Sequence, residues 1–254
     1  MKNVLRCLLS SAVLLAAVTL LGEPRTESPG AGKVPQKRWD PTSSYEVSQI
    51  EGWSVLVNKA FLREEPALCK QTLTLLRCQL YQIVRGVPPE AVAKLQKVRL
   101  WVEEREPHHP CMAYHPDPGW LGRHDMNPEK ARCVEVANAR NFLRWTMEQP
   151  WMVLHELAHA YHHQFLGGYG NAEILAAYRS AMEAKRYDAV LRYNGKTVRA
   201  YAAKNQMEYF AESTEAFFGT NDFYPFVQAE LKQHDPQGHR LLEKLWGVRR
   251  NKGK

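Results

Sequence analysis

The chain has 254 residues, of which 44% are hydrophobic and 24% charged, and its 34 basic and 27 acidic side chains give a net charge of +7. This composition is typical of a globular protein and excludes a largely disordered chain, a collagen-like repeat, a coiled coil and a protein with several membrane spans. The basic residues are scattered rather than gathered in stripes with aromatic platforms, so we expect no nucleic-acid partner.

The N-terminal segment predicts export from the cytoplasm. Lys2 and Arg6 precede an uncharged apolar run from Cys7 to Leu21. The run is about 15 residues long, whereas a membrane-spanning helix needs roughly 20, so residues 1–22 are expected to be a signal peptide. The residues before the expected cleavage point match a cleavage site poorly, so an uncleaved N-terminal anchor is the alternative. Such an anchor would be the only predicted contact with a membrane. Either way, we expect a secreted, periplasmic or otherwise extracytoplasmic protein.

The next elements predict a small sheet. Residues 23–40 are rich in Pro, Gly and charged residues and predict a flexible linker, followed by one domain over residues 41–254. Alternating apolar residues on both sides of Glu51 and Gly52 predict a β-hairpin, and Asn58 is expected to cap a helix that extends to Gly86. The remaining elements of this half are a helix over residues 88–97, strands at 98–102 and 133–137, and a short edge strand at 111–115 within a Pro-rich loop.

The second half of the chain is predicted to be helical. Its expected helices cover residues 151–166, 172–191 and 205–218, with Gly219 ending the third, and the last 30 or so residues, interrupted at Asp235-Pro236. A hairpin turn is expected at Asn194-Gly195. Together with the strands of the first half, this pattern predicts an α+β fold with a small mixed sheet packed on the helix over residues 151–166.

Four cysteines remain if Cys7 is removed with the signal peptide: Cys69, Cys78, Cys111 and Cys133. In an oxidising compartment this number predicts two disulfide bonds. A bridge between Cys111 and Cys133 is the favoured pairing, because an unbroken helix would hold the other two cysteines too far apart. The spacing of the cysteines does not indicate a zinc or redox site.

The strongest motif is HExxH at His155, Glu156 and His159, within an amphipathic helix. Two histidines four residues apart share one face of a helix, so both can bind one Zn²⁺ ion per chain, and the intervening glutamate lies beside the metal-bound water. A third ligand is needed. His162 is too far along the axis to share the ion and is expected at the surface or at the rim of a pocket.

The third ligand is expected from the helix over residues 205–218, where Glu208, Glu212 and Glu215 recur on one stripe. A solvated acidic face is the alternative explanation, but aromatic residues on both sides of the stripe favour burial, and buried carboxylates need partners such as zinc and its histidines.

The string from Tyr201 to Glu212, downstream of HExxH, resembles the lethal-factor-type zinc metallopeptidases, which include the proline-proline endopeptidases. The resemblance covers about 70 residues, from His155 to Phe218, and includes Asn205. It implies a zincin-like domain of the gluzincin kind, Glu208 as the third zinc ligand and Tyr201 as the residue that stabilises the transition state. The family also includes the catalytic domain of a toxin. The targeting domains of that toxin have no counterpart in this sequence, and its substrate is not carried over.

These observations predict a secreted zinc metalloendopeptidase acting on a peptide or protein. Glu156 would take a proton from the zinc-bound water and Tyr201 would stabilise the oxyanion, although a core tyrosine is the alternative for the latter. Glu212 is expected to orient a ligand histidine, or in a minor alternative to bind the metal itself. Ala113 and Tyr114 are the candidates for a sheet edge that pairs with substrate.

Two other functions remain open at this point. One is a non-catalytic, zinc-stabilised module that docks an extracellular protein or a cell-envelope polymer, and the other is a zinc hydrolase of a non-peptide amide. The sequence does not indicate an oligomeric state.

Overall fold

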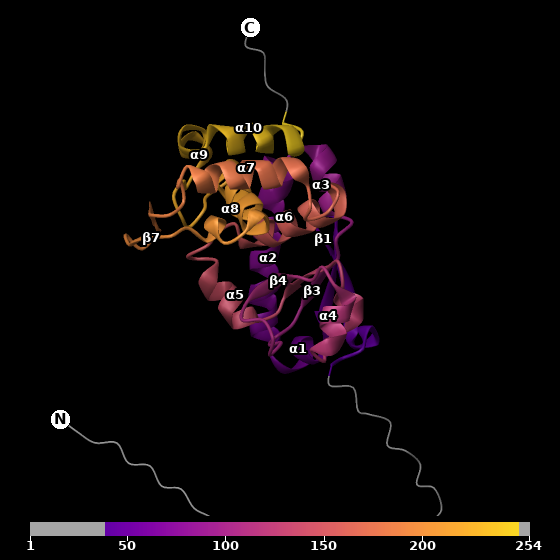
Figure 1. Ribbon diagram of the computed structural model, residues 1–254. Coiled ribbons are helices and arrows are strands. Elements are labelled where there is room, and N and C mark those ends of the chain that lie inside the picture. Colours follow the sequence, from indigo (N-terminus) through magenta and orange to yellow (C-terminus); the bar gives the residue numbers. More distant parts are fainter. Residues whose placement is uncertain (1–38, 249–254) are drawn as a thin grey trace, which may run out of the picture. The chain divides into compact units, whose positions relative to one another are not determined.

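The computed structural model describes residues 39–248, which all belong to one compact unit of the chain (Figure 1). These residues form a mixture of helices and a small mixed sheet, so the predicted α+β class is confirmed at that level. The predicted signal peptide, residues 1–22, and all but the last two residues of the predicted linker lie outside the described part. Within residues 39–248, no helix is both long and apolar enough to cross a membrane.

The sheet has five strands in the order β1-β2-β3-β5-β4. They are β1 (Tyr45–Ile50), β2 (Trp53–Asn58), β3 (Leu100–Val102), β4 (Met112–Tyr114) and β5 (Val134–Val136). The strands β2, β3 and β5 are parallel to one another, while β1 and β4 run antiparallel to their neighbours. β4 is therefore an edge strand, as the sequence predicts.

Turn chemistry explains the first hairpin and the helix after it. Glu51 and Gly52 both adopt left-handed backbone angles, with φ of 49° and 89°, which suit a tight turn between right-twisted strands. The Oδ1 atom of Asn58 accepts a hydrogen bond from the amide of Ala60 at 2.8 Å and caps α1 (Lys59–Glu64) as predicted. The connection from β2 to the parallel strand β3 continues through α2 (Pro66–Gly86) and α3 (Pro89–Leu95).

Strand alternation gives the sheet two different faces. Val55 and Val57 point into the main core, whereas Leu56 belongs to a small second cluster with Tyr45, Trp101 and Cys133. The second face is covered by the segment that contains α4 (Pro118–Arg123) and the short 3₁₀ helix η2 (Pro128–Lys130), since Lys130 lies over the rings of Tyr45 and Trp101.

In the second half of the chain, the helices from Met152 on form a layer above the sheet in Figure 1, and the helix before them lies at the level of the strands. The helices of this half are α5 (Ala139–Trp145), α6 (Met152–Phe165), α7 (Ala172–Glu183), α8 (Gln206–Phe218), α9 (Gln228–His234) and α10 (Pro236–Leu245). The helix α6 packs against the edge strand β4 on one side and against α8 on another, and α7 and α10 cover α8. The edge strand, α6 and α8 therefore meet in one place.

A glycine allows the close approach of α8 to the start of α6. A Cβ atom on Gly219, which ends α8, would lie 1.9 Å from Cε2 of Trp151, the residue before α6. Every residue other than glycine would clash with that indole ring.

The prediction of a helix over residues 172–191 is wrong at its end. α7 ends at Glu183, because Lys185 takes a positive φ of 54° and the amide of Arg186 bonds back to the carbonyl of Ala181 at 3.1 Å. This is a Schellman stop, which usually carries glycine. Residues 190–191 instead form β6 (Val190–Leu191), which pairs with β7 (Thr197–Val198) across the predicted turn at Asn194-Gly195.

The favoured disulfide bond is also wrong in this structure. All four described cysteines are free thiols. Cys111 lies in the main core and Cys133 lies in the small cluster, on the other face of the sheet, so their side chains cannot meet.

Candidate metal and catalytic site

Three side chains predicted to bind a metal lie together where α6 meets α8. The Nε2 atoms of His155 and His159 are 3.1 Å apart, and Oε2 of Glu208 is 3.3 Å from the first and 3.1 Å from the second. Each of the three side chains has a small exposed fraction, 12% or less. The site is therefore sheltered, with the ligand atoms turned toward one another.

Local sequence fixes this arrangement. His155 and His159 are one turn apart on α6, whose other faces are buried by apolar residues. Glu208 lies in the first turn of α8, where Oδ1 of Asn205 accepts hydrogen bonds from the amides of Met207 and Glu208, both at 2.9 Å. The N-cap thus sets where α8 begins and hence where Glu208 points.

The donor atoms fit a zinc ion. Bonds of about 2.0–2.1 Å in a tetrahedral arrangement place neighbouring ligand atoms roughly 3.3 Å apart, which is close to the separations seen here. Two imidazole nitrogens and one carboxylate oxygen are also a donor set found in catalytic zinc proteins, and three protein ligands leave one position open.

The second nitrogen of His155 is held by a carboxylate. Oε1 of Glu215 lies 2.6 Å from Nδ1 of His155 and also accepts a hydrogen bond from Nε2 of Gln149 at 2.9 Å. Glu212, which the sequence reasoning assigned to this contact, lies farther away, at 3.8 Å from the same nitrogen. Glu215 belongs to the same predicted acidic stripe, but the choice between the two depended on the relative rotation of α6 and α8, which the sequence pattern does not specify.

The surroundings of Glu208 and Glu212 on α8 shift the pKa values of these two acids in opposite directions. Burial alone would raise the pKa of Glu208, but hydrogen bonds from His155 and His159 outweigh it and hold the pKa of Glu208 well below its usual range. Burial, together with the nearby charge of Glu215, raises the pKa of Glu212 well above its usual range. The surroundings of Glu208 therefore favour its anionic form, while those of Glu212 favour its neutral form.

Glu156 connects the metal site to the edge strand. Its Oε2 atom accepts a hydrogen bond from the backbone amide of Tyr114 at 2.9 Å. Backbone groups of Cys111 and His115 bond toward β5, so by alternation those of Met112 and Tyr114 face outward. The two residues predicted to bind substrate therefore differ. The backbone of Tyr114 faces the outer edge of the sheet, whereas Ala113 lines the cleft but its backbone bonds toward β5.

Tyr201 lies beside the same site. It begins the short 3₁₀ helix η3 (Tyr201–Ala203), and 41% of its surface is exposed, so the alternative of a core tyrosine is wrong. Its hydroxyl accepts a hydrogen bond from Nζ of Lys204 at 2.8 Å. Lys204 was not predicted as a site residue, although the sequence places it between Tyr201 and Glu208.

Two clefts meet at these residues, and His155, Glu156, Tyr201 and Met112 line both. One cleft, about 270 Å³, continues past Tyr114 and Pro116, and the other, about 390 Å³, continues past Pro110 and Trp145. His159 and Glu208 line the smaller cleft, so the candidate metal site lies in that cleft at the border with the larger one.

The expectation for His162 is wrong. The residue lies wholly inside the protein, between the rings of Tyr169 and Phe210, each with its centroid 5.2 Å from that of His162. Neither ring nitrogen has a hydrogen-bond partner among the described residues. Burial, followed by the charges of His159 and His163, lowers the pKa of His162 to about 4, so the ring is neutral.

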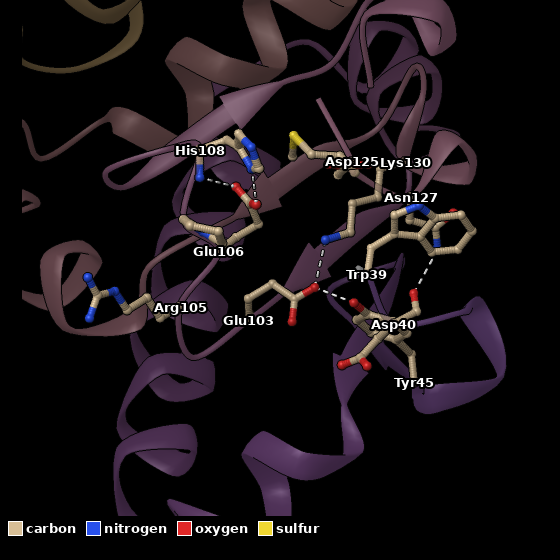
Figure 2. A pocket seen from close by; sticks show the side chains of 12 residues that line it. Trp39, Asp40, Tyr45, Glu103, Arg105, Glu106, His108, Asp125, Asn127 and Lys130 are labelled. Atoms are coloured by element: carbon tan, nitrogen blue, oxygen red, sulfur yellow. Dashed lines mark hydrogen bonds and ion pairs between the residues drawn. The ribbon is translucent and has the colours of Figure 1, made fainter. Parts of the chain in front are cut away.

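A separate polar cavity of about 330 Å³ lies on the second face of the sheet (Figure 2). Lys130 is buried there and pairs with Glu103 at 2.6 Å and with Glu135, whose other oxygen binds His115 at 2.7 Å. Figure 2 shows Lys130 reaching toward Glu103, and Glu106 holding His108. These paired side chains attach the loop segment that contains Lys130 to the sheet.

No protein-family model, curated protein or solved structure matches this chain.

Proposed function

We propose that this protein is a zinc-dependent peptidase with a zincin-like fold that acts outside the cytoplasm. The observation that carries the proposal is the convergence of His155, His159 and Glu208 within 3.1–3.3 Å, next to Glu156 and the free edge of β4. The resemblance of the two motifs to the lethal-factor-type metallopeptidases supports the same assignment.

In this proposal each residue has one task. Zinc, when bound by the two histidines and Glu208, would supply a Lewis acid that activates water and polarises the substrate carbonyl. Glu156 accepts the proton of the attacking water and passes it to the leaving amine. Tyr201 donates a hydrogen bond to the oxyanion of the tetrahedral intermediate. Glu215 keeps the ring of His155 in the orientation that aims Nε2 at the ion.

The edge strand gives the substrate a direction. An extended peptide that pairs antiparallel with β4 runs its amino-terminal side along the cleft beside Tyr114 and Pro116. Its carboxyl-terminal side then follows the cleft beside Pro110 and Trp145. The scissile bond falls between the two clefts, where Glu156 and Tyr201 line both. A folded protein would have to offer such a segment in an exposed loop or tail.

The second candidate is a zinc hydrolase of a non-peptide amide, which would use the same residues. A free strand edge favours the peptidase, because a small amide has no use for a row of backbone donors and acceptors. A non-catalytic binding module would need neither Glu156 in the cleft nor Tyr201 beside the metal site.

The test is to incubate the purified chain, loaded with Zn²⁺, with a mixed peptide library and to identify cleaved bonds by mass spectrometry. Glu156→Gln is the matched control, because it keeps the shape of the side chain and removes the base, and a chelator is the second control. Cleavage that both controls abolish supports the peptidase. Bound zinc without any cleavage would favour the amide hydrolase or the binding module, and failure to bind zinc would refute the metal site.

A further inference from the structure

Lys204 connects the two sides of the candidate site. Its Nζ atom lies 2.8 Å from the hydroxyl of Tyr201 and 3.5 Å from Oε1 of Glu208, and it lies 4.6 Å from the centroid of the Tyr201 ring. The two oxygens of Glu208 therefore have different partners. Oε2 faces the histidines, and Oε1 faces the lysine.

From these contacts we propose that Lys204 is a positioning residue that holds the Tyr201 hydroxyl where it can donate into the cleft, an inference that rests on the proposed peptidase function. An ammonium group can only donate hydrogen bonds, so Lys204 occupies a lone pair of the phenol oxygen. The hydrogen of the phenol is not used in this contact and stays available for the oxyanion.

Exposure explains why such a residue is needed. Tyr201 is 41% exposed and lies on a single 3₁₀ turn, so packing alone does not fix its hydroxyl. Lys204 closes that turn, with its amide bonded to the carbonyl of Tyr201 at 2.9 Å, and Asn205 then caps α8. The lysine therefore comes from a backbone position held by that hydrogen bond and reaches back to the ring.

The competing explanation is an ordinary surface ion pair between Lys204 and Glu208. The side chain of Lys204 is 55% exposed, and ion pairs of that kind contribute little to stability. The two explanations differ in what the removal of the ammonium group changes. A positioning role affects Tyr201 and the rate of the chemical step, whereas a role through Glu208 affects the affinity for the metal.

The experiment compares Lys204→Met, Lys204→Arg, Tyr201→Phe and the double variant Lys204→Met with Tyr201→Phe, using a peptide that the library identifies. We expect Lys204→Met to lower kcat about tenfold with KM unchanged, and Lys204→Arg to restore most of it. The double variant should be no slower than Tyr201→Phe, because Lys204 acts through that hydroxyl. Lys70→Met, at an exposed position of α2, is the matched control and should leave kcat unchanged.

Two readouts do not depend on activity. In chain labelled with ¹³C-tyrosine, the Cζ resonance of Tyr201, assigned by its loss in Tyr201→Phe, should move in Lys204→Met by more than its line width. The affinity for Zn²⁺, measured by competition with a chelator, should stay within about twofold. An unmoved resonance, an additive loss of rate in the double variant, or a loss of rate that follows a loss of zinc would each overturn the proposal. If the unsubstituted chain binds zinc and cleaves no peptide, the peptidase function fails, and the resonance still decides whether Lys204 holds the hydroxyl.

Discussion

Replacing His162 by leucine should make the stability of the protein less dependent on pH. His162 has a folded-state pKa of about 4, against an ordinary value of 6.5, because burial and the neighbouring histidines disfavour its charged form. At pH 8 the ring is neutral in both folded and unfolded chains and contributes no pH dependence. As the pH falls through 6.5, the unfolded chain takes up a proton that the folded chain does not, so stability is lost.

The pKa difference sets the size of the effect. A difference of about 2.5 units corresponds to about 3.4 kcal/mol once the pH is below 4, and to about 2 kcal/mol between pH 8 and pH 5. Because leucine does not titrate, the free energy of unfolding of His162→Leu should fall by about 2 kcal/mol less than that of the unsubstituted chain over this pH range.

Urea unfolding at pH 8 and pH 5 measures this difference. A chelator keeps both proteins free of metal, so proton-linked release of an ion does not contribute, and all other titrating groups cancel in the comparison. The measurement at pH 8 is the internal control for changes in packing. Equal losses of stability in the two proteins would refute the reasoning that His162 is a buried neutral base.

Three further substitutions test other parts of the structure. Glu215→Gln removes the charged partner of His155 and should weaken zinc binding about 10-fold to 100-fold, measured by competition with a chelator. Gly219→Ala places a methyl group against Trp151 and should lower the free energy of unfolding by about 1–3 kcal/mol in urea. Lys130→Met removes the ammonium group that pairs with two buried acids of the second face and should lower the same quantity by about 3–5 kcal/mol.

Each of these has a matched control. Glu212→Gln should weaken zinc binding less than Glu215→Gln, since the oxygen of Glu212 lies 3.8 Å from Nδ1 of His155 and that of Glu215 lies 2.6 Å from it. Gly122→Ala introduces a methyl group that meets nothing within 4 Å, and Lys70→Met removes an exposed lysine, so both should be nearly neutral. A result in which a control loses as much as its partner would contradict the contact assigned to that partner.

The sequence predicted those features that depend on local chemistry. The hairpin at Glu51-Gly52, the cap at Asn58 and the boundaries of α8 between Asn205 and Gly219 all follow from turn and capping residues, and the structure confirms them. Helical spacing named His155 and His159 as ligands, the resemblance of the second motif implied Glu208, and the structure brings the three together.

Features that depend on how helices and strands pack together could not be predicted from the sequence. Glu215 rather than Glu212 touches His155 because of the rotation of α8 about its own axis. Cys111 precedes β4 and packs in the main core, away from Cys133 in the small cluster, and Lys185 ends α7 in a conformation that its side chain does not favour. The burial of His162 was the hardest feature to predict. Its ring nitrogens have no hydrogen-bond partner among the described residues, and no sequence pattern marks such a histidine as part of the core.

The hydrogen bond between Glu156 and Tyr114 also bears on solubility. An edge strand with free amides and carbonyls is a template on which the edge of another molecule can add, and such pairing leads to aggregation. β4 is only three residues long, and the carboxylate of Glu156 covers one of its outward amides with a negative charge. Removing that carboxylate group, as in Glu156→Ala, should therefore expose the Tyr114 amide, and concentrated solutions of this variant should self-associate more readily than those of the unsubstituted chain, which light scattering can follow.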